Sequence, residues 1–158
     1  MKKSTAFFTA FILLAVLFSC SKAKETLGIA TATWHIGSTA YSSTSVQKQN
    51  DSEYVANGDN NMQIFFASAP TAGTYKIVSE QKAGLNKLAA GEMAVELNIG
   101  ANDVYLSTGT DNISGTVTFN TDGEITITFP TIEVRHLQVN NGSPIDLGTT
   151  TADGELEH

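Results

Sequence analysis

The sequence predicts an all-β domain, and three observations support this prediction. Short stretches rich in Thr, Val, Ile, Tyr and Phe recur along the chain, separated by Gly, Pro, Asn and Asp. Several of these stretches alternate apolar and polar residues with the two-residue period of a strand. Only residues 79–90 have helical spacing, which Gly84 and Gly91 weaken. About nine strands at this spacing predict an antiparallel β-sandwich, Ig-like or jelly-roll-like, with a closed lipocalin-like barrel as the alternative.

The first half of the predicted domain contains two candidate hairpins. Residues 27–36 and 39–46 are rich in β-forming residues and are expected to be strands. Asn57-Gly58 favours a turn with positive φ at both central positions, so the flanking segments should form a hairpin. The segment around Pro70 is expected to turn a second hairpin between residues 61–68 and 73–79.

The second half contains the clearest alternation. Residues 93–99 place Met, Val, Leu and Ile on one face, and residues 103–107 follow as a brief strand. Residues 113–119 and 125–129 alternate on either side of Asp122-Gly123, which predicts a hairpin. Pro130 is expected to interrupt that strand. A further strand should then cover residues 131–139, before Asn141-Gly142 and a polar tail.

The beginning of the chain has the layout of a bacterial export signal. Lys2 and Lys3 precede an apolar run over residues 6–18, and small residues follow. The run is shorter than the roughly 20 apolar residues that cross a bilayer. Residues 1–19 are therefore predicted to be a removable signal peptide.

The end of this run, Leu17-Phe18-Ser19-Cys20, resembles the lipobox of bacterial lipoproteins, although Phe18 stands where a smaller residue is usual. The resemblance implies that a diacylglyceryl group is attached to Cys20, the only cysteine, and that fatty acyl chains such as palmitate anchor the protein. Residues 20–26 would be a tether and residues 27–158 a single β domain. The location implied is the outer membrane of the cell envelope, on its periplasmic or cell-surface side. The alternative is ordinary cleavage nearby, for instance after Ala23.

The charge balance argues against one class of partner. The net charge is −7, and all sixteen acidic residues follow Cys20. Loss of Lys2 and Lys3 with the signal peptide would make it about −9. An acidic surface repels phosphate, so nucleic acid is not expected to bind.

A second resemblance covers the later part of the chain. Gly73-Thr74-Tyr75 and Ile113-Ser114-Gly115-Thr116, with the hairpin that follows, are similar to segments of small all-β lipoproteins of the phylum Bacteroidota, a group of unassigned function. The resemblance implies a β-sandwich and carries over no catalytic residue.

The sequence offers no catalytic motif, so the protein is not expected to be an enzyme. The chain lacks a Gly-x-Ser-x-Gly elbow and a phosphate-binding loop. His35 and His136 would approach each other only if their strands paired, and neither has the spacing of a zinc site. Residues 57–61 resemble the start of a calcium loop but lack its Gly and Glu, so binding of Ca²⁺ there stays open. No metal or cofactor is predicted, and Leu156-Glu157-His158 could be the remnant of a tag.

The candidate binding residues are aromatic. Aromatic rings on a β-sheet face can stack on the apolar faces of sugars, although such rings more often fill the core. The candidates are Trp34, Tyr41, Tyr54 and Phe65. Phe65 and Phe66 are adjacent and cannot both point inward from one regular strand, so one must be exposed or meet a second layer.

The function expected from the sequence is that of a lipid-anchored, non-catalytic binding or scaffold module for a protein or a glycan. Two alternatives stay open, a small barrel that carries an apolar ligand and a hydrolase of unknown class. The oligomeric state and the ligand are not determined by the sequence.

Overall fold

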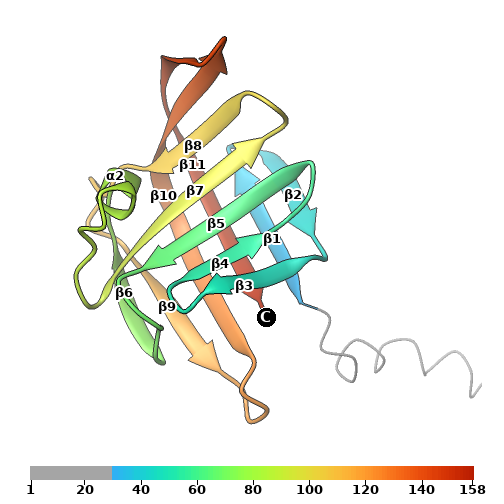
Figure 1. Cartoon of the computed structure of the whole chain (residues 1–158), viewed down its shortest axis with the longest axis vertical. Helices are drawn as coiled ribbons and strands as arrows, with labels where there is room; N and C mark the ends of the chain where they lie inside the picture. The colour runs from blue at the N-terminus through green and yellow to red at the C-terminus, as the bar shows by residue number, and fades with distance from the viewer. Residues whose placement is uncertain (1–29) are drawn as a thin grey trace, which may run out of the picture.

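The computed structural model describes residues 30–158, which are mostly β-strand (Figure 1). The helix in this range is the short α2 (Glu80–Gly84), which lies within residues 79–90, the stretch with helical spacing. The all-β prediction is confirmed. The predicted signal peptide and the tether with Cys20 lie outside the described residues.

The strands all belong to one 11-stranded sheet. They are β1 (Thr31–Ile36), β2 (Thr39–Ser43), β3 (Val46–Asn50), β4 (Glu53–Ala56), β5 (Asn60–Phe66), β6 (Gly73–Ile77), β7 (Glu92–Ile99), β8 (Asp103–Ser107), β9 (Ser114–Phe119), β10 (Ile125–Asn140) and β11 (Ser143–Glu157).

The sheet order is β2-β1-β11-β10-β9-β6-β7-β5-β4-β3, and β8 pairs with both β7 and β10. The ladders are antiparallel except for the short parallel one between β6 and β7. In Figure 1, β3, β4, β5 and β7 cross in front of β1 and β11. The sheet therefore folds over on itself, and its core lies between two layers, as in a sandwich.

Several predicted elements are confirmed. Strand β8 matches its predicted bounds, and β7 begins one residue earlier than expected. The hairpin at Asp122-Gly123 joins β9 to β10, with Phe119 opposite Ile125. These segments were predictable because their alternation and turn chemistry are local. Asn141-Gly142, expected only to precede a polar tail, turns the chain from β10 into β11, with positive φ at both residues, 51° and 78°.

The two early hairpins have different outcomes. Strands β4 and β5 pair antiparallel as predicted, but neither Asn57 nor Gly58 has positive φ, so the turn between them is not the type expected. The prediction of a hairpin around Pro70 was wrong. Strand β6 leaves β5 and pairs instead with β9 and β7, because β5 is already flanked by β4 and β7.

The prediction of a polar tail was also wrong. Residues 143–157 form β11, which lies between β10 and β1 in the middle of the sheet. Ala152 and Leu156 of this strand belong to the core, with Leu156 0% exposed. Residues 143–157 are therefore an integral strand, and Leu156 packs in the core.

The interruption expected at Pro130 is a bulge, and the residues on both sides of it belong to one strand. Strand β10 continues through residues 125–140 with a β-bulge between Phe129 and Ile132 in its pairing with β11. The bulge changes the inward-facing residues from odd to even numbers, so Phe129 and Ile132 are both buried. Pro130 lies where the ladder is already interrupted, and no pairing is lost to its missing N–H.

The core is closely packed around two glycines. Its largest fully buried side chains include Trp34, Phe129, Met62 and Met93. A Cβ added to Gly154 would lie 2.8 Å from Phe129 Cζ and 2.9 Å from Trp34 Cβ. A Cβ added to Gly115 would lie 2.8 Å from the sulfur of Met93. These positions require glycine because large side chains fill the adjacent space.

Gly154→Ala is therefore expected to lower the free energy of unfolding by about 1–3 kcal/mol, since overpacking displaces Phe129 or Trp34. Chemical denaturation checks this value. Gly84→Ala is the matched control, because its nearest neighbour would be the flexible Glu80 side chain at 3.6 Å. The control should be neutral or stabilising by up to about 1 kcal/mol. Equal effects of the two changes would contradict close packing at Gly154.

Candidate functional site

The outer face of the sheet, opposite the core, carries the candidate site. Strands β5, β7, β8, β10 and β11 are successive neighbours on this face. Directly opposed residues of an antiparallel ladder share a face. One row across it therefore consists of Gln63, Glu96, Leu106, Arg135 and Thr149. Three hollows lie along this face, and α2 lies between the first and the second.

The first hollow, the Phe65 groove, is a cleft of about 380 Å³ at the end of β5. Its lining residues are Asn50, Ser52, Glu53, Phe65, Phe66, Ala67, Ala83, Gly84, Asn86 and Leu88. Phe66 points into the core and is 4% exposed, so the adjacent Phe65 points to the outer face. Asn50 donates a hydrogen bond of 2.9 Å to Glu53, which is directly opposite Phe65. An aromatic ring thus lies beside an amide and a carboxylate.

Polar side chains continue from Phe65 along β5 and β7. Gln63 and Asn61 follow Phe65 on the same face, opposite Glu96 and Asn98. Asn98 donates hydrogen bonds to Asn61 at 2.9 Å and to Glu96 at 2.8 Å. These mutual contacts fix the amide and carboxylate groups in position before any ligand arrives, which lowers the entropy cost of binding.

The segment that contains α2 is attached to β7. Lys82 of α2 donates to both carboxylate oxygens of Glu92 at 2.7 Å. The backbone N–H of Ala89 donates to Glu92 at 2.9 Å. This N–H and then Lys82 hold the pKa of Glu92 below its usual value. These bonds fix the wall of the Phe65 groove that Ala83 to Leu88 form.

The second hollow, the Glu80 cleft, is a space of about 370 Å³ on the other side of α2. It is lined by Ser79, Glu80, Gln81, Leu106, Ser107, Thr108 and Arg135. Burial raises the pKa of Glu80, and the nearby Glu96 raises it further. Arg135 donates to Asp146 through Nε at 2.9 Å and Nη2 at 2.7 Å.

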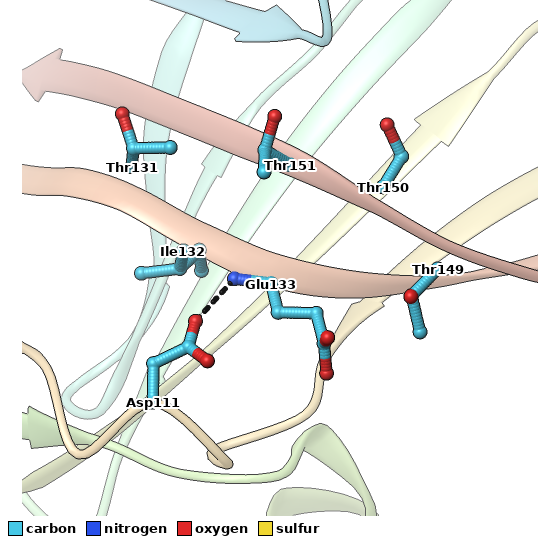
Figure 2. Close-up of a pocket in the computed structure, with 7 residues that line it drawn as sticks. All are labelled: Asp111, Thr131, Ile132, Glu133, Thr149, Thr150 and Thr151. Atoms are coloured by element: carbon cyan, nitrogen blue, oxygen red, sulfur yellow. Dashed lines mark hydrogen bonds between the residues drawn. The ribbon is translucent and has the colours of Figure 1, made fainter.

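The third hollow, the threonine groove, is a space of about 400 Å³ over the bulge in β10 (Figure 2). It is lined by Asp111, Thr131, Ile132, Glu133, Thr149, Thr150 and Thr151. Figure 2 shows Asp111 reaching from its loop to the backbone N–H of Glu133, which donates at 2.7 Å. The Glu133 carboxylate in turn accepts from Thr108 at 3.1 Å and Thr110 at 2.9 Å.

The four predicted aromatic residues do not form one exposed strip. Trp34 is 0% exposed and Tyr54 5% exposed, so both belong to the core. Tyr41 is partly buried and stacks on Trp34 with ring centres 5.9 Å apart. Phe65 alone lines one of the three hollows. Two adjacent phenylalanines were expected to face opposite sides of their strand. Phe65 does face away from the core, and it lines the groove together with residues of the α2 segment.

The two histidines do not meet, because their strands do not pair. Strand β11 lies between β1 and β10. His35 instead contacts Asp153 at 3.0 Å, and His136 contacts Asp103 at 2.7 Å. No three of the His, Cys, Asp and Glu residues between positions 30 and 158 come together as a metal site. In the 57–61 segment, Asn61 is occupied by its bonds to Gln63 and Asn98.

Sequence reasoning missed Glu80, Arg135, Asp111 and Glu133. Glu133 and Arg135 lie on β10, whereas Glu80 lies on α2 and Asp111 in a loop. No spacing in the sequence indicates that they line neighbouring hollows. Strict alternation along β10 would also place Glu133 and Arg135 on the core side. The bulge reverses the two faces, and in the sequence it is marked only by Pro130, which is an ambiguous signal.

Comparisons of the chain with protein-family models, with curated proteins and with solved structures find no match. Within residues 30–158, no helix is long and apolar enough to cross a membrane.

The raised pKa of Glu80 predicts a pH-dependent effect of Glu80→Gln. Because the folded-state pKa lies above the usual 4.5, ionisation of Glu80 costs stability as the pH rises through and beyond 4.5. The glutamine variant should therefore be more stable than the wild type at neutral pH, and this advantage should vanish well below pH 4.5. Thermal unfolding across this pH range measures the difference.

Asp59→Asn, in the exposed turn between β4 and β5, is the control for loss of one negative charge. It should show no such pH-dependent gain. A gain for Glu80→Gln that is the same at every pH would show that packing, not charge, causes it.

Proposed function

We propose that this protein is a lipid-anchored, non-catalytic module of the bacterial cell envelope that binds polysaccharide on the outer face of its sheet. The observation that carries the proposal is the Phe65 groove. In it, an outward-facing aromatic ring lies beside Asn50, Glu53 and Asn86. The ring offers a surface for the C–H face of a sugar, while the amides and the carboxylate can exchange hydrogen bonds with its hydroxyl groups.

The polar face beside the groove also supports a glycan as the ligand. Asn61, Gln63, Glu96 and Asn98 present both donors and acceptors in fixed positions. A surface of amides and carboxylates suits a polyhydroxylated ligand better than the apolar core of a protein interface, from which charged residues are usually depleted.

The close packing of the core favours a surface binder over a carrier of apolar ligands. A carrier needs an interior cavity of some hundreds of Å³. At Gly154 and Gly115, even one added methyl group would collide with Phe129, Trp34 or Met93. The hollows described above instead open on the outer face.

The proposed anchor is a lipid on Cys20, supported by the lipobox Leu17-Phe18-Ser19-Cys20. Stable attachment takes two or more acyl chains, because a single chain binds a bilayer only marginally. We place the domain at the outer membrane, where a short tether would hold its binding face close to envelope or environmental polysaccharides.

Phe65→Ala is expected to weaken polysaccharide binding roughly ten-fold, equivalent to about 1.4 kcal/mol, because the stacking surface is lost. An array that includes β-glucan, mannan and galacturonan identifies a ligand, and titration calorimetry then measures its affinity. Phe119→Ala is the matched control, since Phe119 is 43% exposed on β9 outside the groove. Absence of any polysaccharide ligand, or equal losses in the two variants, would contradict the proposal.

Cys20→Ser should abolish incorporation of labelled palmitate in cells and release the protein from the membrane fraction, because serine lacks the thiol that takes the lipid. Metabolic labelling and fractionation measure both effects. Ser19→Ala, which keeps a small residue before the cysteine, is the control and should remain lipidated. A Cys20→Ser variant that still carries palmitate would refute the anchor.

A further inference from the structure

The Glu80 cleft and the threonine groove are neighbouring parts of one surface. Leu106 of the cleft lies directly opposite Arg135, and Arg135 lies directly opposite Thr149 of the groove. Thr108 lines the cleft and donates to Glu133, which lines the groove. A ligand that lies along this face can therefore pass from one hollow to the other.

This surface differs chemically from the Phe65 groove. It has the hydroxyl groups of Ser79 and several threonines, the carboxylates of Glu80, Asp111 and Glu133, and no aromatic ring among its lining residues. Only one oxygen of the Glu133 carboxylate accepts the bonds from Thr108 and Thr110. Hydroxyl groups of a sugar can donate to such carboxylates in charge-assisted hydrogen bonds and exchange bonds with the threonines.

The separation between the two regions sets the size of a ligand that contacts both. Four inter-strand spacings separate β5, which carries Phe65, from β11, which carries Thr149 to Thr151. At about 4.8 Å each, they amount to roughly 19 Å. Leu85, 55% exposed at the end of α2, lies next to Gly84 of the Phe65 groove and offers an apolar contact on the way. A single sugar cannot span this distance, whereas a chain of sugars can.

We infer that the ligand is a linear polysaccharide chain, bound at two subsites on opposite sides of α2. The Phe65 groove holds one part of the chain by stacking. The Glu80 cleft and the threonine groove together hold a later part by hydrogen bonds. This inference rests on the proposed function, and it adds that affinity depends on chain length.

The test compares disaccharides with long oligosaccharides of β-glucan, mannan and galacturonan on the chain from Cys20 onward. The long chain that binds is expected to do so at least ten-fold more tightly than its disaccharide. Thr149→Arg, which places a bulky side chain in the threonine groove, should remove this advantage. Phe65→Ala should weaken both ligands. Thr118→Arg, the same change at an exposed threonine of β9, is the control and should alter neither affinity.

The outcomes separate the two claims. Absence of binding to every saccharide would overturn the proposed function. Binding without dependence on chain length, or a length advantage that survives Thr149→Arg, would overturn the second subsite only. Backbone amide shifts in the wild-type protein give a measurement that needs no variant. Thr108 and Thr149 to Thr151 should shift with the long chain and not with the disaccharide, and the absence of this difference would also overturn the second subsite.

Discussion

The ladder between β10 and β11 is the constraint on which the rest of this structure depends. The two strands pair from Thr126 opposite Glu157 to the hairpin at Asn141-Gly142, and together they contact three further strands. Strand β10 pairs first with β9 and then with β8, so it connects both layers. In the gap between β9 and β8, no strand pairs with the N–H of Glu133. The Asp111 carboxylate accepts its hydrogen bond instead. This bond is exposed to solvent, so its net contribution to stability is that of an ordinary hydrogen bond, about 0.5–1.5 kcal/mol.

The change in the partner of β10, from β9 to β8, also produces the surface that we assign to ligand binding. Because β8 joins β7 to β10, the outer faces of β5, β7, β8, β10 and β11 form one continuous area. The bulge at Pro130-Thr131 turns Glu133 and Arg135 to that area and keeps Phe129 and Ile132 in the core. The feature that keeps a long strand in phase with the core thus also supplies the polar residues of the threonine groove and the Glu80 cleft.

The fold class and the local elements could be predicted from the sequence, whereas the long-range pairing could not. The strands at 93–99 and 103–107 and the turn at Asp122-Gly123 follow from alternation and turn residues. Strand β11 was missed because most of residues 143–151 are exposed, which leaves too few apolar residues to show a period. Of the candidate site, only Phe65 could be identified, because its contradiction with Phe66 is visible within one strand. Glu80, Asp111 and Arg135 become neighbours of the site only through pairings between distant segments.

The position of Thr31 opposite Glu157 has a mechanical consequence. With the proposed lipid anchor and a large bound ligand, the load would act between the anchor and the binding face and would enter the domain at the start of β1. This strand is hydrogen-bonded to β11 on one side and to β2 on the other. Antiparallel hydrogen bonds lie perpendicular to the strands, so a pull along β1 loads both ladders in shear, with many bonds sharing the force. Such an attachment point resists extraction of the strand, whereas a sideways pull would open the bonds one after another.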